Sequence, residues 1–438
     1  MEKGLVSVDR WTEGSQAYFL THLHSDHTQG LSSTWSRAPI FCSRITAKLF
    51  PFKFPDFNLS LLRVVDVGFW YSLSLVFPSS ASRTTVEFMP IHAHHCPGAV
   101  MFLFRGDFGW MLYTGDFRWE ANSERAQLGR TTLLNALKGH RLDVLHLDNT
   151  YCNPSYDFPP RSVAAQQVVD IIVSHPEHDI IIGIDTLGKE ELLLRISRLL
   201  KTKIWVWPER LQTMHLLGFH HIFTTKTTLT RIRAVPRYSF SIDTLEELNK
   251  KCPTIGIMPS GVPWLMKPSD GADNLFGSLL TSHYKKRQGS TSGRLQNGKF
   301  KDNIKPVDGR HRYIYSVPYS DHSCYAELQE FIELVQPISM KGIVSSSCCY
   351  VDPVYYFGRL CGGSKPLERL SDKQEKEDGS ERVVAPEMKS CLVSAKSTNT
   401  DRKRKTGKGG STGIHALRRV RRGAKIIQND FSADSLES

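Results

Sequence analysis

Thr21-His22-Leu23-His24-Ser25-Asp26-His27 places four side chains that can bind a metal ion within six residues. Residues 17–21 are short and apolar, as is typical of a strand, and Gly30 follows, so the histidines lie where a strand passes into a loop. On a strand, His22 and His24 leave the same face. Asp26 and His27 come later and can turn back toward a second ion. Imidazole and carboxylate ligands together favour zinc, with iron or manganese as alternatives.

The composition is ordinary for a soluble protein with more than one domain. The chain has 438 residues, of which 40% are hydrophobic and 23% charged, and its length predicts about two to three domains. A net charge of +12 favours a polyanionic partner. The nine cysteines form no paired CxxC motifs, which argues against a zinc finger or a disulfide scaffold and fits a reducing compartment. The first nine residues carry both signs of charge, so we expect no secretory signal.

One apolar stretch has a length close to that of a membrane span. It covers residues 59–77 and includes Arg63, Asp66 and a glycine. Charges and a glycine are costly inside a membrane span. We therefore expect a buried strand and a loop here, and no membrane contact.

Residues 1–158 have the pattern of a domain with many short strands and few helices. Polar groups follow three of these strands: His94 and His95 after the first, Asp116 after the second and Asp148 after the third. Polar groups at successive strand ends converge on one edge of a sheet, so we expect them to meet. The expected strands cover residues 18–20, 40–42, 86–92, 100–104, 110–113 and 144–147.

The pattern changes after Pro160. A helix is expected over residues 163–175, a strand over 180–184 and a helix over 190–200. The strand is apolar without alternation, which suits a strand that is covered on both faces. Strand–helix alternation at this spacing predicts parallel βαβ units, and hence a separate α/β module over residues 159–267.

A polar segment is expected between the α/β module and the return of the chain to the first domain. Residues 268–310 are polar and predict a long, exposed and flexible loop. Residues 311–360 are expected to return to the first domain, with a strand over 313–317 and a helix over 325–335.

The last segment, residues 361–438, has one aromatic residue and holds 17 Lys and Arg against 11 Asp and Glu. Such a segment cannot bury enough apolar surface to fold by itself, so we expect a disordered basic tail. Its basic clusters, residues 402–405 and 418–422, are typical of nuclear import signals or nucleic-acid-binding arms. The tail is also the expected contact for protein partners.

The candidate ligands at the strand ends number seven, which exceeds what one zinc ion needs. Two ions about 3.5–4 Å apart, sharing a bridging carboxylate, would use all of them and clamp a displaced phosphate. A water held between the ions has its pKa lowered to about 7 and becomes the nucleophile, so no serine or cysteine nucleophile is required. The predicted first site is His22, His24 and His95, the second is Asp26, His27 and His322, and the bridge is Asp116.

The order of these motifs resembles the metallo-β-lactamase fold, and Asp148 and His322 resemble its β-CASP subgroup, whose members cleave nucleic acids. More narrowly, residues 1 to about 360 resemble the DNA-processing branch, the DNA cross-link repair family, and within it the Apollo-like 5′ exonucleases. The resemblance implies an α/β protein: an αββα sandwich with an inserted α/β β-CASP domain, with the disordered basic tail outside it. The motifs that carry it are His94-His95-Cys96-Pro97-Gly98, Leu112-Tyr113-Thr114-Gly115-Asp116-Phe117-Arg118, Leu147-Asp148-Asn149-Thr150, Thr186-Leu187-Gly188-Lys189-Glu190 and Pro318-Tyr319-Ser320-Asp321-His322-Ser323.

The resemblance also implies roles for single residues. Asp9 would be a structural acid that holds the histidine loop, and Asp148 would accept a hydrogen bond from a ligating imidazole. His95 is expected to coordinate in preference to His94, because it directly precedes Cys96-Pro97-Gly98. Cys96 itself is expected to serve packing. The implied catalytic residues are Asp26, Asp116, Asp148 and His322.

A turn between the strand at 180–184 and the following helix is a candidate phosphate pocket. A helix N-terminus, a hydroxyl and an ammonium group together suit a phosphate. The resemblance implies that this pocket binds a 5′-phosphate, so that cleavage would run from that end. The residues expected in the pocket are Thr186, Gly188, Lys189 and Ser260.

The leading hypothesis is a nuclear 5′→3′ DNA exonuclease that uses Zn²⁺, with Mn²⁺ or Mg²⁺ as alternatives at the second site. From the resemblance, its substrate would be DNA with a free 5′-phosphate, in the repair of damaged or interstrand-crosslinked DNA. The rivals are a β-CASP RNA endonuclease, a small-molecule hydrolase of the same fold and an inactive scaffold that recruits repair proteins. Val344 argues against the RNA endonuclease, because RNA-cleaving members of the subgroup usually carry a histidine there. The α/β insert argues against the small-molecule hydrolase, and the complete ligand set argues against the inactive scaffold.

Overall fold

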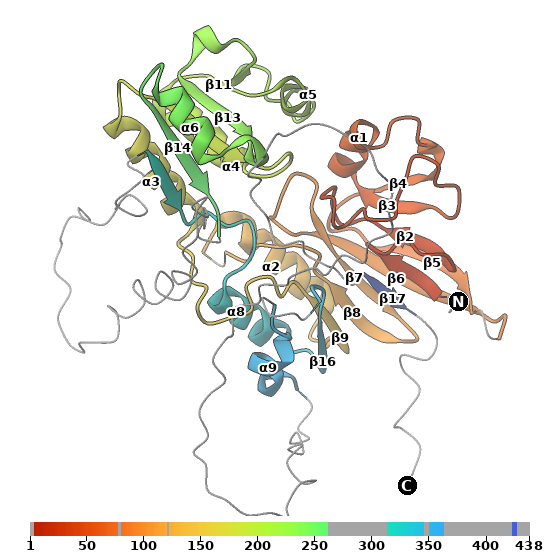
Figure 1. Ribbon diagram of the computed structural model, residues 1–438. Coiled ribbons are helices and arrows are strands. Elements are labelled where there is room, and N and C mark those ends of the chain that lie inside the picture. The colour runs from red at the N-terminus through yellow and green to blue at the C-terminus, as the bar shows by residue number, and fades with distance from the viewer. Residues whose placement is uncertain are drawn as a thin grey trace, which may run out of the picture. The chain divides into compact units, whose positions relative to one another are not determined.

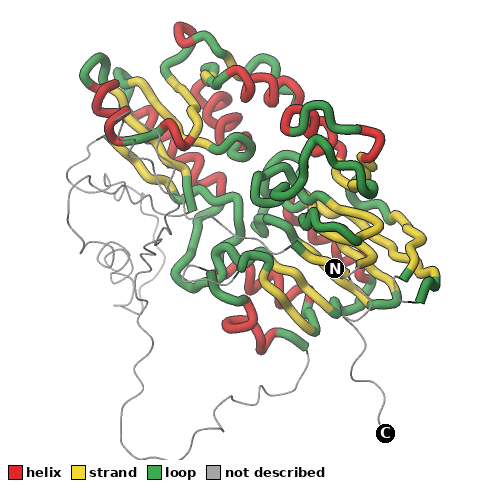
Figure 2. The backbone as a smooth tube through the Cα atoms, turned by 45° about the vertical axis from the view of Figure 1, so that its right-hand side comes forward, coloured by secondary structure: helices red, strands yellow, loops and turns green. Residues whose placement is uncertain are grey.

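The computed structural model describes residues 4–77, 80–120, 122–261, 313–345, 350–362 and 423–426 (Figures 1 and 2). The described strands form three sheets, here called A, B and C. Sheet A has the order β17-β1-β2-β3-β4, with bounds Ala424–Ile426, Gly4–Val8, Ser15–Phe19, Ile40–Ser43 and Leu62–Val65. Sheet B has the order β16-β9-β8-β7-β6-β5, with bounds Ser339–Gly342, Val144–Leu147, Gly109–Tyr113, Val100–Gly106, Arg83–His92 and Tyr71–Val76.

Sheets A and B share one core, which is built largely from phenylalanine rings. Phe19 of β2 lies 5.1 Å from Phe41 of β3, between ring centroids, and 4.8 Å from Phe88 of β6. The inner face of β6 follows from its sequence, because buried and exposed residues alternate along its first half. Aromatic pairs at these distances add to the free energy of burying their apolar area.

Helices cover the outer faces of both sheets (Figure 1). Helix α1 (Arg44–Lys53) buries Leu49 and Phe50 against sheet A. Helices α2 (Glu124–Leu137) and α8 (Tyr325–Val335) bury apolar side chains such as Leu133 and Phe331 against sheet B. The layers are therefore helix, sheet, sheet and helix, and the predicted αββα sandwich is confirmed.

Sheet C belongs to the inserted module, and every strand pair in it is parallel. Its order is β12-β11-β13-β10-β14-β15, with bounds Phe223–Thr224, Ile204–Trp205, Ile232–Pro236, Asp179–Ile184, Thr254–Pro259 and Ile314–Val317. Strand β10 is buried along its last five residues, as its unbroken apolar run predicts. The helices of the module, seen beside the sheet in Figure 2, are α3 (Arg161–Ser174), α4 (Glu190–Leu200), α5 (Pro208–Leu216) and α6 (Ile242–Asn249).

One predicted boundary is wrong. Residues 314–317 were expected to open the return to the first domain, but β15 pairs with β14 and is the last strand of sheet C. The open edge of β14 offers backbone partners that the side-chain pattern of β15 does not reveal. The return begins after Val317, where Ser323 donates its backbone N–H to the carbonyl of Phe117 and α8 follows.

The prediction of a disordered tail over 361–438 is also wrong for three residues. Ala424–Ile426 form β17, which pairs antiparallel with β1 at the edge of sheet A. Ala424 and Ile426 are buried, so a short alternating apolar pair suffices to add a strand to an open edge. Most of the predicted tail, including both basic clusters, and the predicted loop over 268–310 lie outside the described residues.

The apolar stretch over 59–77 forms two strands instead of one buried strand. β4 and β5 each bury one residue, Val65 and Leu75, and their other residues are exposed or partly exposed, so neither strand is covered on both faces. Within the described ranges, no helix is long and apolar enough to cross a membrane.

Candidate metal centre

The ends of strands from all three sheets bring the predicted ligands together. Asp116 follows β8, His95 follows β6, and His322 follows β15. The loop with His22, His24 and His27 follows β2. This convergence is what the polar strand ends predicted.

The Asp116 carboxylate is the centre of this cluster and is 1% exposed. Its two oxygens face the Nε2 atoms of four histidines. The distances are 3.2 Å to His27 from Oδ1, and 3.5 Å to His95, 3.7 Å to His22 and 3.8 Å to His322 from Oδ2. One carboxylate that faces four ring nitrogens is suited to bridge two metal ions.

The same four histidines are held from behind at Nδ1. The partners of Nδ1 are Thr21 Oγ1 for His22 (3.0 Å), the Asp9 carboxylate for His27 (2.6 Å), the Asp321 carbonyl for His95 (2.8 Å) and the Asp148 carboxylate for His322 (2.7 Å). Carboxylate and carbonyl oxygens can only accept, so the Nδ1 atoms facing them carry the proton. Each such Nε2 then presents its lone pair toward Asp116, as a metal ligand does. Asp9 and Asp148 lie where the resemblance implied.

The His24 ring is held at Nε2 instead of Nδ1. Its Nε2 lies 2.9 Å from the carbonyl oxygen of Leu187, so Nε2 donates and Nδ1 keeps its lone pair. That Nδ1 lies 3.0 Å from Nε2 of His95. The lone pairs of these two nitrogens point at one another and would repel. A cation between them would remove this repulsion.

The acid–base state of the cluster also fits a metal. Burial lowers the pKa of His22 well below its ordinary value, and the neighbouring His27 lowers it further. Burial likewise lowers the pKa values of His24 and His95. The imidazoles are therefore neutral near pH 7, which is the form that coordinates metals. Nε2 of His22 is buried and has no hydrogen-bond partner among the described residues.

Three groups of side chains could each hold a metal ion, because within each group the ligating atoms lie within 4.8 Å of one another. They are His22, His24, His95 and Cys96; His22, His27 and Asp116; and His95, Asp116 and His322. The first matches the predicted first site, with a thiol added. Burial raises the pKa of that Cys96 thiol, which sequence reasoning had assigned to packing alone.

The predicted second site, with Asp26, His27 and His322, stays a prediction. Asp26 belongs to none of the three groups in the described part of the chain. The turn over 25–27 leaves Asp26 partly exposed, and its charge favours the protonated forms of His24 and Lys53. His27 groups instead with His22 and Asp116. Spacing in the sequence could not reveal this, because the direction of a side chain in a turn depends on its backbone angles.

The rings of His94 and His95 point to different neighbours, and their directions favour the predicted coordination by His95. The His95 ring faces Asp116 from a buried position. His94 has a backbone φ of 55° and directs its ring toward Gly129 of α2. His94 is in none of the ligand groups found among the described residues.

The predicted phosphate pocket lies at the turn between β10 and α4, and its polar groups already have protein partners. Lys189 Nζ lies 2.8 Å from the Asp321 carboxylate. The Gly188 N–H donates to Glu190, and Arg210 donates to the carbonyls of Thr186 and Gly188. Ser260 donates its backbone N–H to Val317, at the end of the neighbouring strands.

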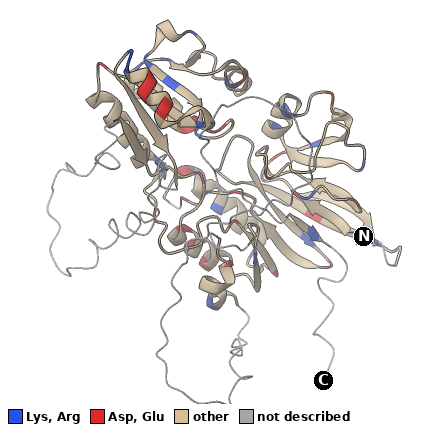
Figure 3. Cartoon of the chain, in the orientation of Figure 1, with Lys and Arg blue, Asp and Glu red and all other residues tan. Residues whose placement is uncertain are grey.

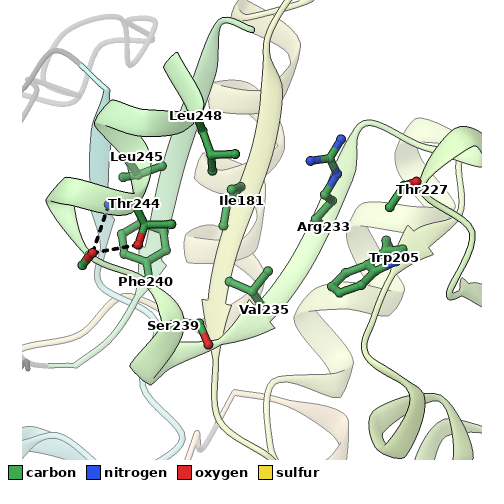
Figure 4. Close-up of a pocket in the computed structure, with 11 residues that line it drawn as sticks. Ile181, Trp205, Thr227, Arg233, Val235, Ser239, Phe240, Thr244, Leu245 and Leu248 are labelled. Carbon is green, nitrogen blue, oxygen red and sulfur yellow. Dashed lines mark hydrogen bonds between the residues drawn. The ribbon is translucent and has the colours of Figure 1, made fainter. Parts of the chain in front are cut away.

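A separate cavity lies within the inserted module (Figure 4). It is lined by Ile181 of β10, Val235 of β13, and Leu245 and Leu248 of α6. It contains none of the predicted site residues. Arg233 of β13 also lines the cavity, and helix α6 carries Asp243, Glu246 and Glu247 (Figure 3).

Replacing Asp148 by Asn is expected to lower the affinity for zinc by about 10- to 100-fold. The Asp148 carboxylate accepts from His322 Nδ1, from the Thr150 hydroxyl and from the Thr150 N–H, so an amide would disturb all three contacts. Chelator competition on the purified protein measures this. Asp143→Asn is the matched control, because Asp143 accepts from the Trp110 N–H and contacts no candidate ligand. Equal zinc affinity in Asp148→Asn and the wild type would contradict the assigned role.

The αββα sandwich, its parallel α/β insert and its histidine-rich centre define the class as metallo-β-lactamase-fold proteins of the β-CASP type. Residues 219–347 match the family model described as DNA repair metallo-beta-lactamase. Over 349 residues the chain is 37% identical to 5′ exonuclease Apollo of Gallus gallus, covering 79% of this chain and 63% of that protein. It is 37% identical over 350 residues to 5′ exonuclease Apollo of Danio rerio, covering 79% and 52%. It is 30% identical over 333 residues to DNA cross-link repair protein SNM1 of Arabidopsis thaliana, covering 74% and 60%.

Over residues 219–347 the chain therefore matches the DNA repair metallo-β-lactamase family, and the relatives extend this similarity over 74–79% of the chain. It spans less than two thirds of the length of these curated relatives.

Proposed function

We propose that this protein is a metal-dependent 5′→3′ exonuclease that hydrolyses phosphodiester bonds of DNA in the repair of damaged or interstrand-crosslinked DNA. The observation that carries the proposal is the buried Asp116 carboxylate, whose oxygens face the Nε2 atoms of four histidines. The names of the relatives, 5′ exonuclease Apollo and DNA cross-link repair protein SNM1, support the substrate and the role.

Zinc is the proposed metal, because the donor set is imidazole and carboxylate. His22, His24 and His95 would hold one ion, Asp26, His27 and His322 would hold a second, and Asp116 would be shared. Mn²⁺ or Mg²⁺ at the second position stays a prediction. When bound, the metal lowers the pKa of a coordinated water and stabilises charge on the phosphate oxygens.

The protein's own groups fix the ligands. Asp9 and Asp148 keep the protons of His27 and His322 on Nδ1, which leaves Nε2 available. Burial keeps the remaining imidazoles neutral. No nucleophilic serine or cysteine is assigned, since the proposed nucleophile is water.

The proposed substrate end is a 5′-phosphate at the turn over 186–189. The Lys189 ammonium has three donors, and Asp321 occupies one of them. Burial would lower the pKa of Lys189, but attraction by the Asp321 carboxylate outweighs it and raises that pKa. A lysine that stays protonated suits a phosphate. The net charge of +12 supports a polyanionic substrate.

Single-stranded DNA labelled at its 3′ end is expected to shorten from the 5′ end, and faster with a 5′-phosphate than with a 5′-hydroxyl. Gel electrophoresis of timed samples measures the ladder, and the wild type with its metal removed by a chelator is the control. Cleavage of RNA of the same sequence, without cleavage of either DNA, would contradict the proposal in favour of an RNA endonuclease. Val344 is buried in the core, so no histidine supports that alternative at this position.

Nuclear localisation and contacts with repair proteins stay predictions. Both rest on the basic clusters over 402–405 and 418–422, which lie outside the described residues.

A further inference from the structure

Two backbone carbonyls that follow strands of sheet C contact the candidate metal centre. The carbonyl of Leu187 accepts from Nε2 of His24 at 2.9 Å, and the carbonyl of Asp321 pairs with Nδ1 of His95 at 2.8 Å. Leu187 follows β10 of sheet C, and Asp321 follows β15 of the same sheet. Two histidines of one ligand group are therefore oriented by carbonyls that directly follow two strands of sheet C.

A buried ion pair ties these two carbonyls together. Lys189, two residues after Leu187, places Nζ 2.8 Å from the Asp321 carboxylate, with side chains 10% and 8% exposed. Arg161 of α3 approaches the other oxygen of Asp321 at 3.8 Å. Two buried charges in this geometry depend on each other, and removing one leaves the other unpaired.

A second buried pair fixes the turn itself. Arg210 of α5 is 1% exposed and donates to the carbonyls of Thr186 and Gly188 and to the Glu190 carboxylate. The carbonyls on either side of Leu187 are thus held by one guanidinium. The Leu187 carbonyl is left to face His24.

We infer that Lys189 and Asp321 are positioning residues of the metal centre. Their ion pair fixes the positions of the Leu187 and Asp321 carbonyls, which orient His24 and His95. The inference deepens the proposed function and rests on its metal centre. It gives Lys189 a task that is independent of the 5′-phosphate. A lysine needed for substrate alone would have no reason to be buried against a carboxylate that repels phosphate.

The full-length Lys189→Met variant is expected to bind zinc about 10- to 100-fold more weakly than the wild type, the range for losing a contact that orients a ligand. Lys189→Arg keeps the charge and is expected to recover most of that affinity. Chelator competition measures the affinity without DNA, and the visible spectrum of the cobalt-substituted protein reports the ligand geometry. Thermal unfolding of the metal-free proteins checks that each variant folds.

The matched control is Arg233→Met, which breaks the Arg233–Asp179 pair of the same module at 2.9 Å. That pair touches no candidate ligand, so zinc affinity is expected to match the wild type. The double variant Lys189→Met/Asp321→Asn is expected to be no worse than Lys189→Met alone, because the two side chains act through one contact.

The outcomes separate the inference from the proposed function. Unchanged zinc affinity and cobalt spectrum in Lys189→Met, with a higher KM only for 5′-phosphorylated DNA, would overturn the inference and leave the nuclease standing. Additive losses in the double variant would also overturn it. A wild-type protein that binds no zinc would instead remove the metal centre, and with it the proposed function.

Discussion

The Asp116→Asn variant is expected to lose phosphodiester hydrolysis, with kcat/KM lowered at least a thousandfold, or about 4 kcal/mol in the activation barrier. The Asp116 carboxylate faces the Nε2 atoms of His22, His27, His95 and His322. An amide keeps the shape but removes the negative charge that two cations would share. Both the affinity for metal and the position of the attacking water depend on it.

Hydrolysis of 3′-labelled DNA and zinc content, both measured on the same preparation, test this expectation. Asp107→Asn is the matched control, because the exposed Asp107 accepts from Thr84 and contacts no candidate ligand. The control is expected to keep wild-type activity. Full activity in Asp116→Asn would remove Asp116 from the reaction.

Replacing Phe19 by Ala is expected to lower the free energy of unfolding by about 3–5 kcal/mol. Phe19 is fully buried between sheets A and B, with its ring 4.8 Å from Phe88 and 4.9 Å from Phe104, between centroids. The loss is large against the roughly 5–15 kcal/mol that hold a typical domain together. Since Phe19 ends β2 and His22 follows three residues later, the cavity would also loosen the histidine loop.

Urea unfolding at a fixed zinc concentration measures the change. Phe52→Ala is the control, because Phe52 is 55% exposed and its loss is expected to cost within about 0.5 kcal/mol. Similar losses in both variants would mean that the rings between the sheets do not form the main core.

The parts of the site that sequence reasoning found are those whose residue types carry the chemistry. His22, His24 and His95 were predicted as one ligand set, because several histidines at strand ends indicate metal binding. In the structure these three histidines lie together. The parallel insert was predictable because strands and helices alternate along it. In each case the signal lies in side chains close in sequence.

The missed features depend on the backbone. The carbonyls of Leu187 and Asp321 orient two histidines, yet any residue type supplies a carbonyl. β15 and β17 join open sheet edges through backbone hydrogen bonds, so their partners leave little trace in short sequences. Asp26 illustrates the same limit, since the turn and not the residue type decides where its carboxylate points.

The pairing of β17 with β1 joins residues about four hundred positions apart in the chain. A protease that cuts over 363–422 would leave this strand held to sheet A by its ladder with β1 and by the burial of Ala424 and Ile426. A chain shortened before residue 423 would present the bare backbone of β1 to solvent, and bare edges invite other strands to pair. Truncations made to remove the basic clusters would therefore alter self-association as well as charge.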